Sequence, residues 1–280
     1  MELSEKLASL HVALASYDGV VVAFSGGADS AFLLAAAVRA LPLDRVVAAT
    51  AVSDSLPAVE LDQARAFASS LGVTHHLPRT FEMARAGYRA NDGDRCFHCK
   101  AELLDTVRPL ADELGIATVA TGTNADDALA GFRPGIRAAA ERGAVTPLLD
   151  AGLSKADVRA ASREWDLPTW DKPAAACLSS RVAYGVEITP SRLARVERAE
   201  AACREWLTSE GIGFRDLRVR DLGESARIEV DVDALAAVTP RSDEVCAVVI
   251  RAGFDRAEVD PVGFRSGSMN ALLADAARFR

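Results

Sequence analysis

A short glycine-rich segment, placed between an apolar run and an amphipathic stretch, is the strongest sign of chemistry in this chain. It reads Ser25, Gly26, Gly27, Ala28, Asp29 and Ser30. Glycines let the backbone approach an anion, serines supply hydroxyl donors, and the unpaired N–H groups of a helix start carry partial positive charge. The segment therefore predicts a cradle for phosphate groups, with a plain architectural turn as the alternative.

The loop is not of the Walker type. The spacing Gly-x-x-x-x-Gly-Lys-Ser/Thr is absent, and no lysine stands beside a glycine. The pattern Ser-Gly-Gly-x-Asp-Ser instead resembles the loop of the ATP pyrophosphatase (PP-loop) superfamily. This resemblance implies that the chain binds ATP, transfers AMP to a substrate oxygen and releases pyrophosphate.

Composition narrows the class of protein. The formal net charge of the 280 residues is −8, which gives no general attraction to a polyanion, so we expect a small-molecule substrate and no nucleic-acid partner. No apolar run reaches membrane-spanning length, and the first residues are acidic where a signal peptide is basic, so we expect a soluble cytoplasmic protein with no membrane partner. Five cysteines form no framework for a secreted fold.

Short apolar runs alternate with amphipathic stretches through the first part of the chain, which predicts an α/β fold with helices on both faces of a parallel sheet. Ligands of such sheets bind outside the carboxyl ends of the strands, where the glycine loop lies. Strands are predicted at 20–24, 46–52, 74–77, 117–121 and 145–149, and helices at 3–16, 30–41, 57–71, 98–114 and 154–165.

A proline-marked stretch from Pro168 to Pro190 interrupts this pattern. We therefore predict a PP-loop ATP pyrophosphatase domain over 1–168. A smaller α+β domain, for substrate binding and oligomerisation, is predicted over 169–280. Its expected elements are helices at 190–209 and 241–252 and strands at 217–220, 226–230 and 257–260.

Three cysteines complete a recognisable pattern. Cys96 and Cys99 form a C-x-x-C motif, and Cys177 stands in Ala-Cys-Leu-Ser-Ser-Arg. Together with the glycine loop, these segments closely resemble the LarE family, ATP-dependent sulfur transferases that make the nickel-pincer nucleotide cofactor. The resemblance runs through residues 24–30, 95–100, 122–127, 172–185, 217–220, 226–230 and 263–270.

The resemblance implies a reaction and an assembly. The substrate would be pyridinium-3,5-dicarboxylate mononucleotide, whose carboxylates become thiocarboxylates by way of acyl-adenylates. Adenylation makes sense because it gives a carboxyl carbon a good leaving group for attack by sulfur. By family analogy we expect a homo-oligomer, for example a hexamer, and an inorganic sulfide or other sulfur donor as a further partner.

The transferred sulfur could come from Cys177 itself or from sulfide carried by a metal cluster. In family members with only the equivalent of Cys177, that cysteine gives up its sulfur and becomes dehydroalanine. Because Cys96 and Cys99 are also present here, three thiolates could ligate a 4Fe-4S cluster and leave one iron open for sulfide, so we predict catalytic transfer. A lone C-x-x-C also fits half a zinc knuckle or a redox pair, although His98 is poorly placed to bind the same ion.

Polar residues follow the predicted strand at 117–121, at the same edge as the loop. Thr123, Asn124 and Asp127 are predicted to bind the nucleotide, and Asp126, Asp127 and Asp29 could hold the Mg²⁺ that accompanies pyrophosphate. Helix capping is the alternative for these asparagine and aspartate residues.

Ser180 and Arg181 follow Cys177 closely enough to face the same cavity. Arg181 could stabilise charge on the α-phosphate as AMP leaves, with a local salt bridge as the alternative. Either Glu197 or Glu200 could add a carboxylate there, although a surface position is expected for both.

Arginines on the second predicted domain could hold the phosphate of the nucleotide substrate. Arg218 and Arg220 project to one face of a predicted strand, and Arg265 joins them by family analogy. A solvated sheet face is the alternative. Cys203 and Cys246 lie on apolar helix faces and are predicted to be core residues.

Three other functions compete with sulfur transfer to a small molecule. A PP-loop tRNA thiolase also uses a C-x-x-C and a distant cysteine, but the acidic balance of the chain disfavours it. An amidating ligase needs an ammonia source such as a glutaminase domain, for which this length leaves no room. A nucleotide-binding protein that senses iron or oxidation would catalyse no reaction.

Overall fold

The computed structural model describes residues 1–129, 134–173, 176–265 and 267–269, so Ala174, Ala175, Ser266 and Asn270 of the expected motifs lie outside the described residues. The described chain divides into two compact units. The first contains residues 1–84 and 96–173, and the second contains 85–95 and 176–269. The boundary after residue 168 and the roles assigned to each side of it stay predictions.

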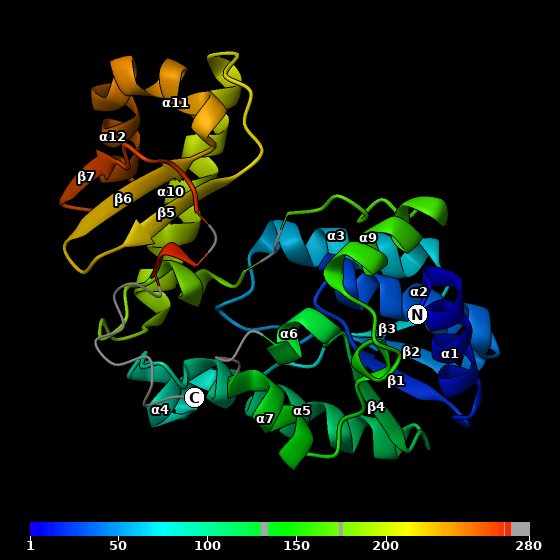
Figure 1. The fold of residues 1–280 in the computed structure, drawn as a ribbon. Helices are drawn as coiled ribbons and strands as arrows, with labels where there is room; N and C mark the ends of the chain where they lie inside the picture. Colours follow the sequence, from blue (N-terminus) through cyan, green and yellow to red (C-terminus); the bar gives the residue numbers. More distant parts are fainter. Residues whose placement is uncertain (130–133, 174–175, 266, 270–280) are drawn as a thin grey trace. The chain divides into compact units, whose positions relative to one another are not determined.

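The first unit is built on a parallel sheet with the strand order β3-β2-β1-β4, in which Val20 pairs with Val46 on one side and Thr118 on the other. The α/β fold class is confirmed. Helices cover both faces of this sheet (Figure 1). The strands are β1 Val20–Ala23, β2 Val46–Ala49, β3 Thr74–His76 and β4 Thr118–Thr121, and the main helices are α1 Leu3–Ala15, α2 Ala28–Ala40, α3 Ala58–Ser70, α5 Arg95–Glu113, α7 Pro134–Glu141 and α9 Lys155–Glu164.

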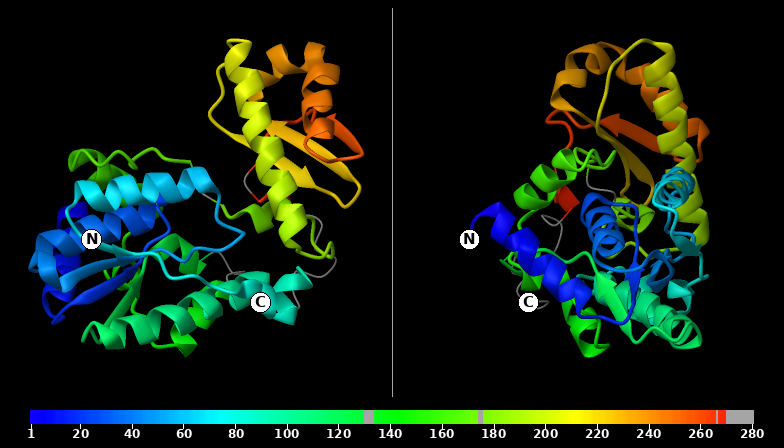
Figure 2. Two further views of the ribbon diagram at one scale, coloured as in Figure 1. Left: turned by 180° about the vertical axis from the view of Figure 1, so that it is seen from behind. Right: turned by 90° about the vertical axis from the view of Figure 1, so that its right-hand side faces the viewer.

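Alternate side chains of strand β1 pack into two separate hydrophobic cores, one on each face of the sheet. Val20 and Val22 pack with α1, α2, α3 and α9, whereas Val21 packs with α5 and α7. Figure 2 shows the sheet between these two helix layers. Both faces of β1 are covered, so all four of its residues are buried and its sequence is a continuous apolar run.

One predicted strand is wrong. In place of a strand over 145–149, Val145 makes a single parallel bridge to Ala120, and Pro147–Asp150 forms the short helix α8. Proline lacks the N–H that a strand ladder needs and suits the first turn of a helix, which explains the difference. The predicted helix over 98–114 begins earlier, at Arg95, so Cys96 and Cys99 are helical.

The second unit contains a three-stranded sheet in which β5 and β6 are antiparallel and β6 and β7 are parallel. Its strands are β5 Leu217–Asp221, β6 Ser225–Val230 and β7 Arg256–Val259, and its helices are α4 Ala86–Arg89, α10 Pro190–Ser209, α11 Val232–Val238 and α12 Ser242–Arg251. Helices α10 and α12 pack on each other and against this sheet. Among the described residues, no helix is long and apolar enough to cross a membrane.

Candidate functional site

The glycine loop joins β1 to α2 and is braced by its two serines. Gly26 has a φ of 73°, a left-handed conformation that favours glycine. The hydroxyls of Ser25 and Ser30 lie 3.1 Å apart, and Ser30 Oγ donates to the carbonyl of Gly27 at 3.1 Å. The first N–H groups of α2 have no partner within the helix, so this braced turn offers them to an anion.

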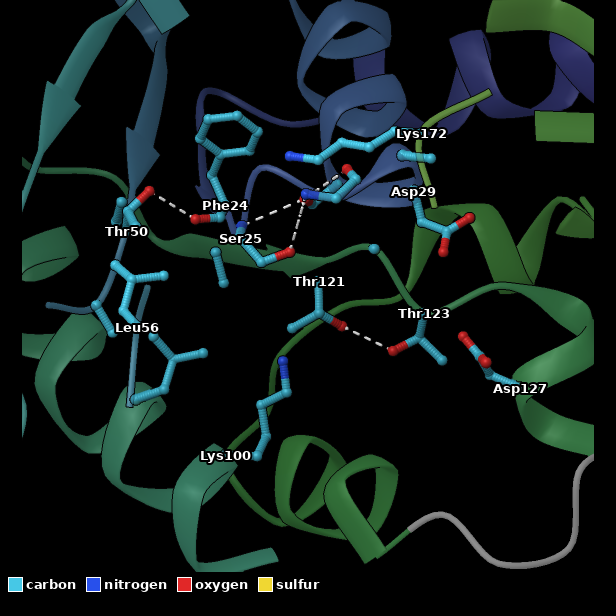
Figure 3. A pocket seen from close by; sticks show the side chains of 18 of the residues that line it. Phe24, Ser25, Asp29, Thr50, Leu56, Lys100, Thr121, Thr123, Asp127 and Lys172 are labelled. Atoms are coloured by element: carbon cyan, nitrogen blue, oxygen red, sulfur yellow. Dashed lines mark hydrogen bonds between the residues drawn. The ribbon is translucent and has the colours of Figure 1, made fainter. Parts of the chain in front are cut away.

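The end of β4 lies directly against this helix start. A Cβ on Gly122 would come within 2.8 Å of the backbone nitrogen of Ser30, so only glycine allows the approach. The hydroxyls of Thr121 and Thr123 lie 3.1 Å apart. Thr123 lines the same cavity as the loop (Figure 3).

The polar residues that follow are arranged as a helix cap. Asn124 is fully buried, and its Oδ1 accepts from the Asp127 backbone N–H at 3.1 Å at the start of α6, Ala125–Leu129. Asp127 Oδ2 accepts in return from the Asn124 N–H at 3.4 Å. Asp126 instead accepts from the backbone N–H of Lys155 at 2.8 Å. Capping is thus present, while the side chain of Asp127 still lines the cavity.

Two carboxylates in the cavity repel each other. Burial raises the pKa of Asp29, and the nearby charge of Asp127 raises it further. The nearby side chain of Asn124 and the charges of Lys155 and Arg159 lower the pKa of Asp29 in part. A cation between Asp29 and Asp127 would relieve the repulsion, and Mg²⁺ is commonly held by one or two carboxylates together with phosphate oxygens.

The cavity has a volume of about 450 Å³ and opens at the carboxyl ends of β1, β2 and β4. Its apolar wall includes Leu56, Leu103 and Pro173. Its lining carries four basic side chains and two acidic ones, although the chain as a whole is acidic. The basic residues are Lys100, Lys155, Arg159 and Lys172. This local excess of positive charge favours an anionic ligand.

Two of these lysines come from different parts of the chain: Lys100, on α5, points into the cavity, and Lys172 runs along its edge beside the glycine loop (Figure 3). Lys172 Nζ lies 2.7 Å from Glu60 Oε2 and 3.0 Å from the Gly26 carbonyl oxygen. Burial lowers the pKa of Lys100, while Cys99, Cys96 and Asp127 raise it.

In the second unit, Cys177 stands at the start of the 3-10 turn Leu178–Arg181. Its carbonyl oxygen accepts from the Ser180 N–H and from Arg181 Nη1, both at 3.0 Å. Arg181 is buried and pairs with Glu200, with Nε and Oε1 2.9 Å apart. The salt-bridge alternative for Arg181 is therefore observed, and Glu200 is a buried partner and not the surface acid we expected.

The arginines of β5 are buried, so they do not form a solvated sheet face. Arg220 donates to Glu229 at 2.9 Å and to the carbonyl of Ser180 at 3.2 Å. Burial lowers the pKa of Arg218, and the nearby charge of Arg181 contributes. The second unit thus gathers Arg181, Arg218 and Arg220 beside the turn that carries Cys177. Arg265 is half-exposed and lies 3.4 Å from Asp260.

The remaining thiols lie in the first unit. Cys96 and Cys99 are three residues apart in the first turn of α5, a spacing that puts both on one helix face. Cys96 is exposed, and Cys99 Sγ lies 3.9 Å from Oε1 of the buried Glu82. Because Cys177 belongs to the other unit, the gathering of three thiols stays a prediction. Over the described ranges, no three His, Cys, Asp or Glu side chains are grouped as metal ligands.

The two other cysteines lie in the second unit. Cys203 is buried as predicted, and burial raises its pKa to about 12. Cys246 is only half-buried, which differs from the core position predicted for it, and burial raises its pKa as well.

Comparison with known proteins identifies the family. No family model matches the chain. An uncharacterized protein of Synechocystis is 41% identical over 97% of this chain and 99% of its own length. One from Methanocaldococcus jannaschii is 27% identical over 63% of this chain and 66% of its own. A Lactiplantibacillus plantarum protein named pyridinium-3,5-bisthiocarboxylic acid mononucleotide synthase is 33% identical over 98% of this chain and 97% of its own. The chain belongs to the LarE family.

The first-unit cavity also contains residues that the sequence analysis did not single out. Four basic residues of the first-unit cavity, Lys100, Lys155, Arg159 and Lys172, were missed. A signal for two of them existed, since Lys100 ends one motif of the LarE resemblance and Lys172 begins another. The roles of all predicted site residues in binding and catalysis stay predictions.

Proposed function

We propose that this LarE-family protein is an ATP-dependent sulfur transferase that acts on carboxylates of pyridinium-3,5-dicarboxylate mononucleotide. The observation that carries the proposal is the positively charged cavity at the start of α2, in a chain with a net charge of −8. The name of the L. plantarum relative supports the substrate class.

The reaction proceeds in two displacements. A substrate carboxylate oxygen attacks the α-phosphorus of ATP, pyrophosphate leaves, and an acyl-adenylate forms. A sulfur nucleophile then attacks the acyl carbon, and the carbon–oxygen bond to AMP breaks. With hydrosulfide as the nucleophile, the products are a thiocarboxylate, AMP and one proton. Each round replaces one carboxylate oxygen with sulfur.

The residues of the first unit supply anion binding for the first displacement. The N–H groups at the start of α2 and the hydroxyls of Ser25 and Ser30 would hold the departing pyrophosphate. Mg²⁺ would neutralise phosphate charge, and Asp29 and Asp127 are the carboxylates that fit it. Lys100 adds a cationic donor from the opposite side of the cavity.

For the second displacement, we propose that Cys96, Cys99 and Cys177 ligate a 4Fe-4S cluster that would carry the sulfide. The position of Cys96 and Cys99 on one helix face supports two of the three ligands. If Cys177 instead donates its own sulfur, residue 177 becomes dehydroalanine.

Two measurements test these proposals. Substrate-dependent release of pyrophosphate, with tRNA as the comparison substrate, tests the reaction; release with tRNA alone would favour a thiolase, and no release would favour a sensor. Anaerobic purification with iron and sulfide quantitation, followed by mass spectrometry of the turned-over protein, tests the cluster. Full activity without iron, together with loss of one hydrogen sulfide at residue 177, would contradict it.

A further inference from the structure

Lys172 lines the cavity and contacts the backbone of the glycine loop. Its ammonium lies 3.0 Å from the carbonyl oxygen of Gly26 and 2.7 Å from a carboxylate oxygen of Glu60. Lys172 lines the cavity, whereas Glu60, on α3, is not one of the lining residues. Glu60 therefore pairs with a lysine of the cavity wall without itself lining the cavity.

The backbone of Lys172 is held as firmly as its side chain. Arg159 donates to the carbonyl oxygen of Lys172 at 2.8 Å and to that of Trp170 at 3.1 Å. An ammonium has three N–H donors, and Gly26 and Glu60 account for two of them. A donor thus remains for a ligand beside the loop, on a residue whose main chain is already fixed.

We propose that Lys172 binds the phosphate groups of the nucleotide and that Glu60 competes with them for its ammonium. The inference rests on the proposed function, because it assumes that a phosphorylated ligand occupies the loop. A pyrophosphate group has more negative charge than one carboxylate and can accept from Lys172 and the α2 N–H groups together. Binding therefore shifts Lys172 from Glu60 to the ligand, and the ion pair positions the lysine before the ligand binds.

A double-mutant cycle with Glu60→Gln and Lys172→Met tests the exchange. Dissociation constants for Mg²⁺-pyrophosphate and for Mg²⁺-ATP are measured by calorimetry. Lys172→Met should weaken binding about tenfold, as expected for the loss of one charge-assisted hydrogen bond. Glu60→Gln removes the competing charge but keeps an acceptor, so it should tighten binding several-fold. In the Lys172→Met background, Glu60→Gln should change nothing.

A matched ion pair provides the control. Lys6 and Asp157 also lie 2.7 Å apart with similar exposure, and Lys6 is not a lining residue of the cavity. Lys6→Met should leave both dissociation constants unchanged. Thermal unfolding of each variant, with Lys172→Gln as a second substitution, separates misfolding from loss of a contact.

The cycle has clear adverse outcomes. Glu60→Gln could raise the affinity equally in the unaltered protein and in Lys172→Met. That result would mean that Glu60 acts only as a distant charge, and it would overturn the proposed exchange. Unchanged binding in folded Lys172→Met and Lys172→Gln would overturn it as well. If the unaltered protein bound neither ATP nor pyrophosphate, the proposed function itself would fail. That result differs from normal binding by the unaltered protein with dissociation constants that the substitutions leave unchanged, which would contradict only the exchange.

Discussion

The approach of Gly122 to the start of α2 gives the sharpest test of how the first unit builds its anion site. In Gly122→Ala, the added Cβ would lie 2.8 Å from the nitrogen of Ser30 and 3.0 Å from the carbonyl carbon of Asp29. These neighbours are backbone atoms, which cannot rotate away as a side chain can. The first turn of α2 or the end of β4 must therefore move.

The size of the movement sets the expected loss. Ordinary van der Waals contact begins near 3.4 Å, so the 2.8 Å approach must open by about 0.6 Å. Overpacking of this kind costs about 1–3 kcal/mol of folding stability. A 0.6 Å shift also stretches an N–H to phosphate hydrogen bond from about 2.9 Å to about 3.5 Å, beyond its normal range. Loss of one such charged hydrogen bond, about 1.5 kcal/mol or more, weakens binding at least about tenfold.

Calorimetric titration with Mg²⁺-ATP and thermal unfolding of the same samples measure both effects. Gly135→Ala is the matched control, since its Cβ would meet nothing closer than 3.6 Å and it lies within helix α7. That variant should bind ATP normally and be at least as stable as the unaltered protein, because alanine favours helix over glycine. If Gly122→Ala kept normal stability and normal ATP affinity, the close approach of β4 to α2 would have no role in the site.

Three further outcomes are expected. Glu200→Leu and Arg181→Met should each lower the free energy of unfolding, measured with urea, by about 3–5 kcal/mol because each strands a buried charge, and the double variant should recover part of the loss; strictly additive losses would contradict the pairing. Because burial and Asp127 raise the pKa of Asp29 above its ordinary value of 3.8, the folded state binds its proton more tightly, and this residue's contribution to stability falls as pH rises above 3.8. Asp29→Asn should therefore raise the melting temperature at neutral pH while weakening Mg²⁺-ATP binding. A lower melting temperature would contradict the inference that the charged Asp29 destabilises the fold. Cys203, whose pKa is raised to about 12, should react with iodoacetamide far more slowly than the exposed Cys96 in the native protein, with comparable labelling of both by mass spectrometry as the adverse result.

The sequence predicted the first-unit fold well because local patterns there agree with the tertiary environment. The apolar run at Val20–Ala23 is buried on both faces, and the glycine turn after it permits the left-handed φ of Gly26. The error at Pro147 arose from reading an apolar run as a strand. Hydrophobicity alone does not separate a short buried strand from a helical turn, and the proline was the decisive local feature.

Charge pairing was harder to predict, since it depends on contacts between residues far apart in the chain. Arg218 and Arg220 alternate with apolar neighbours as an exposed strand would, yet buried carboxylates such as Glu229 compensate Arg220. Glu200 and Arg181 are 19 residues apart and meet only because α10 packs beside the turn that carries Arg181. The choice between Glu197 and Glu200 could not be made without that packing.

The proposed chemistry requires the sulfur to reach an acyl group activated by ATP, and chain connectivity limits how far Cys177 can lie from Lys172. Lys172 is held by Glu60, Gly26 and Arg159, and Arg181 is held by Glu200. Lys172 and Cys177 are five residues apart, so chain length alone keeps their Cα atoms within about 18 Å. Any arrangement that brings the thiol to the acyl-adenylate must respect this limit.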